Sequence, residues 1–388
     1  MGQLVKSVFD VAIDDKSLSS QVYEFDSGRK SAGISSSSII GYTMATPESY
    51  KAFQRSTGNS PTTLEVVTKE VPSLKPNDVL IRIHAVSLNY RDVAMMNGKY
   101  PTPVIDGGVP ASDCAAEVVA LGSEVHDLAI GDRVAPIFNL KSIDGTEEES
   151  SNLGGDVDGV LRQFAVFDRN VLFHLPKHLS WEEAACITCA GTTAWNALGM
   201  PRSKGTALVQ GTGGVSMFGL MICLGAGIRP IITSSSDRKL DLAKAAGGPD
   251  SVDTINYLTH PKWEEEVHRL TNGRGVDVVI NNVGPTAMAQ SLTSLARRGT
   301  VSLVGFLGGF DGSQFPDTVM PILMKNATIR GIYVGTKIDH QNLCSFLTEK
   351  EVNLKPILDD VVFSFEDSQA AFDYLYSGKH MGKVVIRV

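Results

Sequence analysis

The sequence predicts an α/β fold, in which a doubly wound parallel sheet is joined to a smaller, β-rich barrel. Three observations support this prediction. From about residue 180 onward, apolar β-rich runs alternate with helical patterns. Before residue 175, short β-rich runs are separated by turn residues, which is typical of a small antiparallel barrel. A glycine-rich turn follows the first strand of the alternating part.

The length and charge of the chain narrow its possible partners. It has 388 residues, enough for two or three domains, and 43% of them are hydrophobic. The formal net charge of -8 disfavours phosphate backbones and anionic lipid surfaces as partners. We therefore expect a small-molecule substrate, with neither nucleic acid nor a membrane as partner.

The cysteines and the N-terminal residues predict the compartment. Five cysteines are an odd and sparse set in so long a chain, which argues against a disulfide framework. No apolar run approaches the length of a membrane span, and the first residues lack the pattern of a secretory signal. We expect a cytoplasmic protein. Residues 1–43, which end in a serine-rich stretch, are expected to form a flexible extension, the alternative being a docking or regulatory arm.

The β-rich part is expected to contain several short strands. They are predicted at residues 64–70, 79–86, 115–121, 132–137 and 164–171. Turn sequences such as Gly107-Gly108 and Gly131-Asp132 lie between them. Residues 139–159, which contain a run of glutamates and several glycines, predict a long surface loop at the edge of the barrel.

The alternating part begins with a helix, whose predicted N-cap is Ser180 with Glu183 at the capping-box position. Strands are predicted at residues 206–210, 230–233, 276–281 and 300–304, and helices from residues 215, 237 and 286. One or two more helices are expected after residue 335. The chain ends on a predicted strand at residues 383–388, which we expect to return to the barrel.

The glycine-rich turn predicts a dinucleotide site. A buried strand, a turn and a helix follow one another here, so helix-start amides can face a pyrophosphate while glycines allow its close approach. The candidate cofactor-binding residues of the turn are Gly211, Thr212, Gly213, Gly214, Val215 and Ser216. Ser216 stands where the usual fingerprint has a third glycine, so a tight structural turn is the alternative.

The end of the second strand favours NADPH as the cofactor. An NAD site needs a carboxylate here for the ribose 2′-hydroxyl, and that group would repel a 2′-phosphate. The strand instead ends in hydroxyl side chains, including Ser234 and Ser235, and Lys239 follows one turn into the next helix. Asp237 keeps NAD open as the alternative, although its position suits a helix cap better.

Further motifs occur in order along the chain. They are Ser87-Leu88-Asn89-Tyr90-Arg91-Asp92, Asn97-Gly98-Lys99-Tyr100-Pro101, Gly131-Asp132-Arg133-Val134, Thr193-Ala194-Trp195-Asn196-Ala197-Leu198, Ile255-Asn256-Tyr257 and Gly382-Lys383-Val384-Val385. Together with the glycine-rich turn they resemble the medium-chain dehydrogenase/reductase superfamily, and within it the zinc-independent, quinone-oxidoreductase-like and enoyl-reductase-like branch. The resemblance covers about residues 44–388.

This resemblance implies a GroES-like substrate domain, residues 44–175 with 337–388, and a Rossmann cofactor domain, residues 176–336, with the active site between them. The further cofactor contacts that it implies are Lys239 and Tyr257 at the 2′-phosphate, Asn282, Val283, Gly305 and Phe306 at the nicotinamide, and also Thr193 and Lys383. Asn89 would lie near the nicotinamide ribose or the substrate. A homodimer, paired through the sheet edge near residues 331–335, is also implied.

The ligands of a zinc ion are missing from the sequence. Catalytic zinc in alcohol dehydrogenases of this superfamily needs a Cys, a His and a further Cys or acid. Where the first ligand cysteine would fall, the chain has residues 89–92, and where a Gly-His-Glu would fall, it has residues 110–113. Cys186 and Cys189 have CxxC spacing, but they lie in an apolar helix predicted at residues 184–190, without a second pair. We expect no metal, and core packing for both cysteines.

Without zinc, the negative charge that develops on a hydride acceptor needs hydrogen-bond donors or an acid. Tyr100 is our candidate, because its setting resembles that of the proton-donating tyrosine of enoyl-thioester reductases. The alternative is that Tyr100 only shapes the pocket. Arg91 and Asp92 lie nearby in the sequence, and a structural ion pair at the domain edge is the commoner fate of such neighbours.

Taken together, these features predict an NADPH-dependent reductase that transfers hydride to a quinone or an α,β-unsaturated carbonyl. Asn89 and Tyr100 are the candidate catalytic residues. The alternatives are an alcohol or aldehyde oxidoreductase of the same superfamily, and a noncatalytic NADPH-binding sensor or scaffold.

Overall fold

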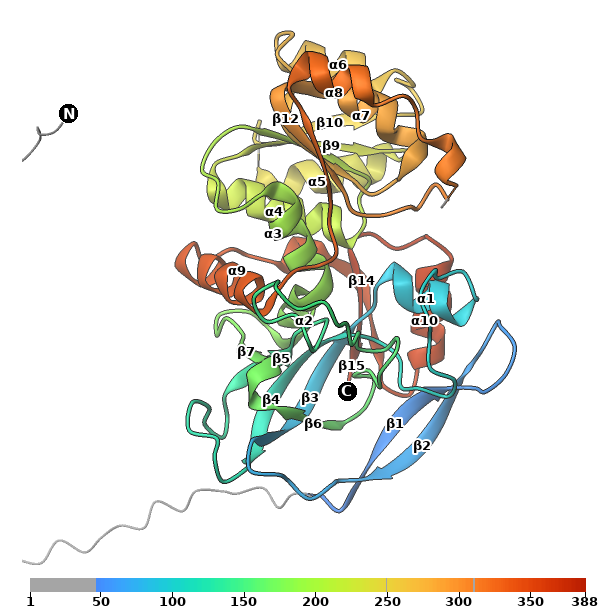
Figure 1. Ribbon diagram of the computed structural model, residues 1–388, viewed down its shortest axis with the longest axis vertical. Coiled ribbons are helices and arrows are strands. Elements are labelled where there is room, and N and C mark those ends of the chain that lie inside the picture. Colours follow the sequence, from blue (N-terminus) through green and yellow to red (C-terminus); the bar gives the residue numbers. More distant parts are fainter. Residues whose placement is uncertain (1–46, 249, 310) are drawn as a thin grey trace, which may run out of the picture. The chain divides into compact units, whose positions relative to one another are not determined.

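Two large β-sheets organise the described part of the chain, as Figure 1 shows. The structure, a computed structural model, describes residues 47–248, 250–309 and 311–388. The predicted flexible extension, residues 1–43, lies outside the described residues. Each large sheet corresponds to one of the two folding patterns that the sequence predicts.

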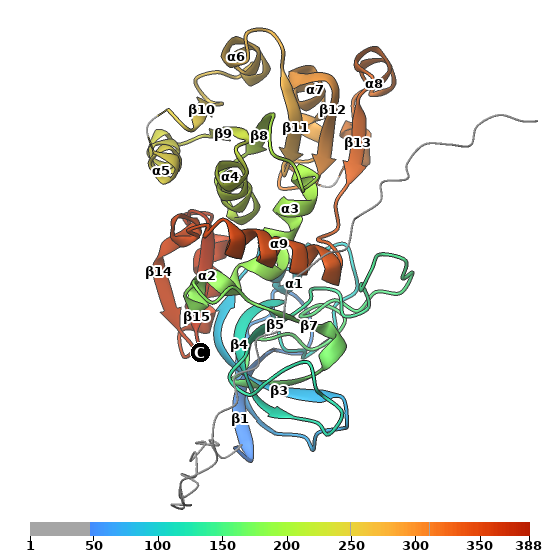
Figure 2. The same cartoon turned by 90° about the vertical axis from the view of Figure 1, so that its left-hand side faces the viewer.

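Six parallel strands form the sheet of the alternating part (Figure 2). In spatial order they are β10 (Asp253–Asn256), β9 (Arg229–Ser234), β8 (Thr206–Gln210), β11 (Val276–Asn281), β12 (Leu295–Leu303) and β13 (Thr328–Gly331). The strand order reverses beside β8, where β9 lies on one side and β11 on the other. Doubly wound sheets bind ligands at the carboxyl ends of the strands at such a switch point.

Helices cover both faces of this sheet (Figure 2). One face is covered by α3 (Thr192–Leu198), α4 (Gly214–Ala226) and α5 (Asp237–Gly247). The other face is covered by α6 (Trp263–Leu270) and α7 (Met288–Ser294). A further helix, α8 (Val319–Lys325), precedes β13. Val279 and Ile280, adjacent in β11, belong to different apolar cores because successive side chains of a strand point to opposite faces. The doubly wound fold is thereby confirmed.

A seven-stranded, mostly antiparallel sheet forms the β-rich part. Its path is β14 (Leu358–Ser364), β15 (Lys383–Arg387), β3 (Asp78–Ser87), β4 (Asp113–Leu121), β5 (Arg133–Pro136) and β7 (Leu172–His174), and β6 (Phe164–Asp168) also pairs with β3. The strands β14 and β15 run parallel to each other. As the sequence predicts, the last strand returns to this sheet, where Val385 lies opposite Ser87.

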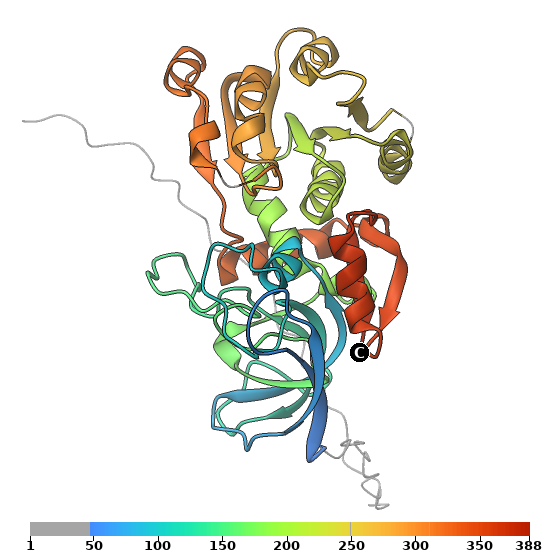
Figure 3. The same ribbon diagram turned by 90° about the vertical axis from the view of Figure 1, so that its right-hand side faces the viewer.

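The remaining elements surround this sheet. The strands β1 (Ser49–Arg55) and β2 (Leu64–Glu70) form a separate antiparallel pair, and the helices are α1 (Tyr90–Met96), α2 (Trp181–Ala185), α9 (Lys337–Glu349) and α10 (Ser368–Tyr376). Figure 3 shows the C-terminal elements in red. The sequence pattern does not predict β1, because this strand has charged and amide side chains among its apolar ones. Within the described residues, no helix is both long and apolar enough to cross a membrane.

The helix predicted at residues 184–190 is divided into two kinds of helix. Its start has the predicted capping box, in which the Glu183 amide donates to Ser180 Oγ at 3.1 Å and the Ser180 amide donates to Glu183 Oε2 at 2.8 Å. After α2 the backbone widens into a π-helical turn, Ile187–Gly191, where the Gly191 amide donates to Cys186 O at 3.3 Å. Apolar spacing alone does not distinguish this turn from an α-helix, and such π-bulges are frequent at functional sites.

Candidate active site

The glycine-rich turn joins β8 to α4 at the switch point of the parallel sheet. Gly211 has a φ of +82°, a conformation that other residues rarely adopt. A Cβ added at Gly211 or Gly213 would have no protein atom within 4 Å, so the backbone is bare at both positions. The first amides of a helix also lack partners within it. The turn can therefore present N–H groups to a pyrophosphate.

Ser216, at the third fingerprint position, has a structural role beneath this turn. Its buried hydroxyl donates to Gln210 O at 2.7 Å and accepts from Asn282 Nδ2 at 2.9 Å. The close helix–strand packing that a third glycine permits occurs at Gly219 instead, where an added Cβ would lie 3.1 Å from Ile280 Cδ1. The serine therefore ties the end of β8 to the residue after β11 without preventing a dinucleotide turn.

The end of β9 lies beside the glycine-rich turn and carries hydroxyl groups. Ser234 is buried, and its hydroxyl accepts from the Ser236 amide at 3.2 Å. Ser235 is exposed. Ser236 is the N-cap of α5, because its hydroxyl accepts from the Lys239 amide. The side chain of Lys239 thus starts within the first turn of α5, next to the strand end.

Asp237, the residue that could have indicated NAD, is engaged with a neighbouring strand. It follows the N-cap rather than forming it, and its Oδ1 accepts from Asn256 Nδ2 at 2.7 Å. Tyr257 follows Asn256, and its amide donates to Ser234 O at 3.1 Å. The Tyr257 side chain is 40% exposed, so it is available to a ligand at the ends of β9 and β10.

The segment before β15 lies against the glycine-rich turn. The Gly382 amide donates to Thr212 O at 2.9 Å, and Gly382 forms a parallel bridge with Gly213. The stem of Lys383 passes over the start of α4, since a Cβ added at Gly214 would lie 2.5 Å from Lys383 Cδ. Gly214 is therefore required for this close approach, a role that the fingerprint alone does not indicate.

The ammonium group of Lys383 lies in a buried polar cluster. It donates to Leu88 O at 2.8 Å and to Asn89 Oδ1 at 2.6 Å, and it lies 3.8 Å from Asp113 Oδ2. Lys383 is 2% exposed and Asp113 is fully buried. The structure thus brings the predicted cofactor residue Lys383 into contact with the predicted catalytic residue Asn89.

Asp113 completes this polar cluster. Its Oδ1 accepts from the Ser112 hydroxyl at 2.7 Å, and its Oδ2 accepts from the Cys189 amide of the π-helical turn at 3.0 Å. The two segments where zinc ligands would fall therefore meet around an ammonium group. Among the described residues, no three His, Cys, Asp or Glu side chains gather in a way that could hold a metal ion. The residues present do not fit a catalytic zinc.

A buried ion pair lies in the first turn of α1. Asn89 is the N-cap, and its amide donates to Asp92 Oδ2 at 2.7 Å. Arg91 Nη1 lies 3.5 Å from Asp92 Oδ1 and donates to Leu153 O at 2.8 Å. Burial raises the pKa of Asp92, and the adjacent guanidinium opposes this shift. The structural ion pair that the sequence predicts is therefore present, and both of its charged side chains are buried.

Aromatic rings surround the Arg91 guanidinium. Its central carbon lies 5.5 Å from the ring centroid of the half-buried Tyr100 and 4.7 Å from that of Phe138. Tyr333 meets Phe138 edge-on, with 6.0 Å between ring centroids. Burial raises the pKa of Tyr333. The sequence predicts Tyr100 as a site residue but not Phe138 or Tyr333, because these two rings come from irregular segments far apart in the chain.

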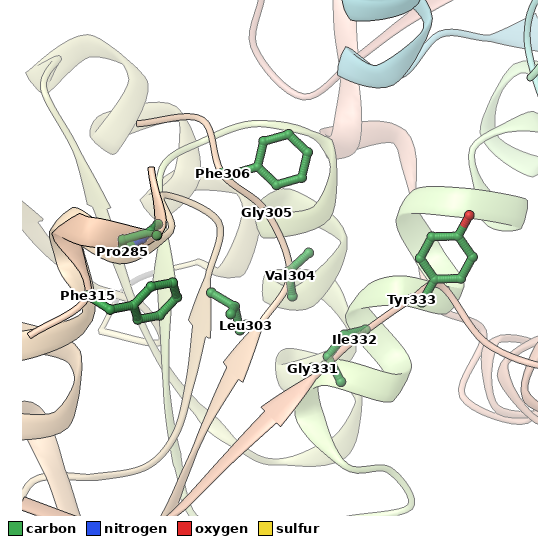
Figure 4. A pocket seen from close by; sticks show the side chains of 10 residues that line it. Pro285, Leu303, Val304, Gly305, Phe306, Phe315, Gly331, Ile332 and Tyr333 are labelled. Atoms are coloured by element: carbon green, nitrogen blue, oxygen red, sulfur yellow. The ribbon is translucent and has the colours of Figure 1, made fainter. Parts of the chain in front are cut away.

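Tyr333 also lines an apolar cavity of about 450 Å³ (Figure 4). Its lining residues are Pro285, Leu303, Val304, Gly305, Phe306, Gly312, Phe315, Gly331, Ile332 and Tyr333. Two of them, Gly305 and Phe306, are predicted to line the nicotinamide. A cavity of this size is within the range of small-molecule sites. It can therefore hold an apolar ring or chain beside the predicted nicotinamide position.

The remaining predicted cofactor residues lie near the same strand ends. Val283 follows β11, and its carbonyl accepts from the Gly308 amide at 2.9 Å. A Cβ added at Gly305 would lie 2.9 Å from Asn282 O, so this glycine permits close packing of two loops. Thr193 is buried in α3. Contact of each of these residues with a cofactor stays a prediction.

The residues at these strand ends fit a dinucleotide. The glycine turn has bare backbone, and hydroxyl groups with Lys239 follow β9. Two buried polar atoms, Asn89 Nδ2 and Gln210 Oε1, have no hydrogen-bond partner among the described residues. Buried polar groups are seldom left unpaired in a complete site. A bound nucleotide with ribose and amide groups would supply such partners.

Two family models match the chain. The GroES-like domain of alcohol dehydrogenases matches residues 75–177, and the zinc-binding dehydrogenase model matches residues 214–349. A zinc-type alcohol dehydrogenase-like protein of Schizosaccharomyces pombe is 38% identical over 330 residues, which cover 82% of this chain and 93% of that protein. The chain belongs to the medium-chain dehydrogenase/reductase superfamily.

Solved structures of medium-chain dehydrogenase/reductases agree with this assignment. An alcohol dehydrogenase structure from Sinorhizobium meliloti 1021 is 34% identical with a TM-score of 0.79, covering 88% of this chain and 100% of that one. A structure of an NAD-dependent alcohol dehydrogenase is 29% identical with a TM-score of 0.75, covering 87% and 99%. The GroES-like and Rossmann-type fold is therefore confirmed, and this medium-chain dehydrogenase/reductase is an oxidoreductase for which a pyridine nucleotide is expected.

Proposed function

We propose that this medium-chain dehydrogenase/reductase is an NADPH-dependent reductase that transfers hydride to a quinone or an α,β-unsaturated carbonyl without a catalytic metal. The observation that carries the proposal is the cluster of Lys383, Asn89 and Asp113, in which an ammonium group lies between the segments that would carry zinc ligands. A conjugated acceptor suits such a site because its charge is delocalised and N–H donors can stabilise it.

Bound NADPH would supply the hydride, which adds to the β-carbon of an enone or to the quinone ring. The addition leaves negative charge on the acceptor oxygen. On the side of the site formed by β15 and α1, positive charge and N–H groups come from Lys383, Asn89 and Arg91. A proton then completes the saturated carbonyl or the hydroquinone. Tyr100, beside Arg91, is the proposed donor of this proton, with solvent as the alternative.

The end of β9 supports NADPH over NADH. Its hydroxyl groups and Lys239 can bind a 2′-phosphate, whereas the nearby carboxylate of Asp237 is already bonded to Asn256. NAD is the alternative cofactor, since one structural relative is described as NAD-dependent. The affinities of the protein for NADPH and for NADH distinguish the two cofactors.

Oxidation or reduction of alcohols and aldehydes is the second candidate function. The observation that favours it is the description of several relatives as alcohol dehydrogenases. Two further relatives are described as zinc-type alcohol dehydrogenase-like proteins, whereas this chain lacks a set of zinc ligands among the described residues. The second function therefore needs a different means of polarising the carbonyl group.

Turnover of a panel of acceptors tests the proposed function. Purified protein is mixed with NADPH or NADH and with quinones, enones, enoyl thioesters or aldehydes, in the presence of a chelator, and the products are identified. We expect chelator-resistant, NADPH-selective formation of hydroquinones or saturated carbonyls. Turnover of aldehydes alone would favour the second function, and binding of NADPH without turnover of any acceptor would favour a sensor or scaffold.

We also propose a homodimer formed through the edge of the parallel sheet. Within the described chain, β13 ends the six-stranded sheet and leaves one side unpaired. The neighbouring α8 exposes large apolar side chains, with Val319 70% and Leu323 69% exposed. An edge strand can pair with its own copy across a two-fold axis, and apolar surface beside it would be buried by that pairing.

A further inference from the structure

A short segment between α10 and β15, residues 377–382, lies over the glycine-rich turn, and we call it the C-terminal strap. The Gly382 amide donates to Thr212 O at 2.9 Å, which fixes the end of the strap to the turn. Gly382 has a φ of +67°, and an added Cβ would lie 2.0 Å from Ile357 O. The backbone there accepts only glycine, so the position of the strap is determined by its contacts on both sides.

Lys239 connects this strap to the 2′-phosphate side of the proposed site. Its ammonium group donates to His380 O at 2.6 Å. Burial lowers the pKa of Lys239, and Asp359 opposes this shift. His380 is thus held between the first turn of α5 and the glycine-rich turn, which are the two places where phosphate groups of a dinucleotide are expected.

The imidazole of His380 is half-buried and incompletely paired. Its Nδ1 is buried and has no hydrogen-bond partner among the described residues. Charged groups face it from three elements, namely Lys239 on α5, Lys383 on β15 and Asp359 on β14. On α10, the Tyr374 ring meets it edge-on, with 6.5 Å between ring centroids. Lys383 already lies near Asp113, whereas Lys239 forms no ion pair among the described residues, so the positive charge of Lys239 beside the imidazole favours an anion as the ligand.

The carboxylate of Asp359 is directed to other partners. Its Oδ2 accepts from the Met381 amide at 2.9 Å, and its Oδ1 accepts from the Tyr374 hydroxyl at 3.2 Å. Asp359 therefore anchors the strap to α10 and does not itself pair with His380. This leaves Nδ1 of the imidazole without a hydrogen-bond partner among the residues that the structure describes.

We propose that His380 is a cofactor-binding residue, which binds the 2′-phosphate of NADPH together with Lys239 and takes up a proton when that phosphate binds. The inference rests on the proposed function, because it requires NADPH at this site. In the free protein, burial and then the charge of Lys239 lower the pKa of His380, so the imidazole is neutral near neutral pH. A bound phosphate raises the pKa of His380 instead, because a negative charge nearby favours the imidazolium.

The sign of the pH effect follows from this proton uptake. The complex holds one proton more than the free protein, so affinity is greatest at low pH and falls as the pH rises through the two pKa values of His380. One linked proton changes affinity by at most about tenfold per pH unit. The free phosphate monoester titrates near pH 6 whichever variant binds it. In the complex its titration is coupled to that of His380, so the difference between wild type and a His380 variant measures the proton linkage of this coupled pair.

Calorimetric titration with NADP+ and NAD+ at about pH 6 and about pH 8, in buffers of different ionisation enthalpy, tests the inference. We expect wild type to take up a proton with NADP+ but not with NAD+. His380→Gln should lose this uptake and bind NADP+ about fivefold more weakly at the lower pH, with NAD+ unchanged. His380→Lys should keep tight NADP+ binding without proton uptake. His126→Gln, at an exposed histidine between β4 and β5, is the matched control.

The outcomes separate this inference from the proposed function. If wild type binds NADP+ no more tightly than NAD+, the proposed cofactor is wrong and the inference fails with it. If wild type prefers NADP+ and His380→Gln retains the same affinity, proton uptake and pH dependence, only the inference is overturned. Unchanged NAD+ binding by His380→Gln shows that the variant is folded, and His380→Lys provides the same comparison if the glutamine variant is unstable.

Discussion

Lys383 Nζ lies 2.6 Å from Asn89 Oδ1 and determines which way the Asn89 amide faces. An ammonium group can only donate hydrogen bonds, so the amide oxygen must face it and Nδ2 must point away. That nitrogen is buried and has no hydrogen-bond partner among the described residues. Lys383 thereby positions an N–H donor of the proposed active site, in addition to its contact with the start of α4.

Replacing Lys383 with methionine should lower both activity and stability. The variant leaves Leu88 O and Asn89 Oδ1 without their donor, which should cost about 1–3 kcal/mol in the free energy of unfolding. Turnover should fall by about a hundredfold, as when one donor to a developing oxyanion is lost. Denaturant unfolding and steady-state kinetics measure the two effects. Wild-type turnover by a folded Lys383→Met protein would contradict the role of this cluster.

Replacing Tyr100 with phenylalanine tests the proposed proton donor. The change keeps the ring that packs near the Arg91 guanidinium and removes only the hydroxyl. Turnover of an enone should fall by about a hundredfold, while NADPH affinity stays nearly the same. Single-turnover kinetics with a titration of NADPH measure both quantities. If turnover with good acceptors is unchanged, Tyr100 only shapes the pocket.

Charge reversal at Lys239 tests recognition of the 2′-phosphate. Lys239→Glu places a carboxylate beside Ser236 at the end of β9, where it would repel a phosphate. The affinity for NADPH should fall by about tenfold to a hundredfold, with little change for NADH. Fluorescence titration with both nucleotides provides the measurement. An equal loss of affinity for both would mean that Lys239 does not distinguish them.

The thiol of Cys189 should be unreactive although it lies next to the polar cluster. Burial and then the charge of Asp113 raise the pKa of Cys189 to about 12. The reactive thiolate is therefore scarce at neutral pH, so an electrophilic enone should be reduced rather than trapped by this thiol. Activity should survive treatment with iodoacetamide, whereas the unfolded chain should be labelled at all five cysteines. Fast alkylation of Cys189 in the native protein would refute this prediction.

Substitution of Leu323 tests the proposed dimer. Leu323→Asp places a charge on the exposed apolar surface of α8, which should convert dimers to monomers without unfolding the chain. Sedimentation or light scattering measures the mass. Val66→Asp is the matched control, because Val66 is also exposed, at 58%, but lies in β2. A wild-type mass of one chain, or equal effects of both variants, would argue against pairing through α8 and β13.

Local sequence patterns predicted most of the fold. The parallel sheet was recognisable because strands buried on both faces are nearly continuously apolar, as Val276 to Ile280 illustrate with Asp277 as the one polar residue. The strand β1 and the π-helical turn at Ile187–Gly191 were missed. The strand β1 depends on its pairing with β2, which lies outside the local pattern. The π-helical turn differs from an α-helix only in which carbonyl groups its amides bond to, and this leaves the apolar pattern unchanged.

Contacts within the candidate site were predictable only where the residues are close in sequence. The glycine-rich turn and the end of β9 each lie within one short segment, so their residues could be proposed together. Asn89 and Lys383 are 294 positions apart, and their contact depends on β15 returning to pair with β3. His380 was missed for the same reason, since its closeness to Lys239 arises from the packing of the C-terminal strap.

The transfer of deuterium from labelled NADPH tests the central proposal most directly. Metal-free protein is given NADPH that carries deuterium at the transferable position of the nicotinamide, together with an enone, and the product is analysed by NMR. We predict a saturated ketone with deuterium on the β-carbon. An allylic alcohol with deuterium on the carbonyl carbon, or a product without deuterium, would contradict the proposed reduction of a conjugated acceptor.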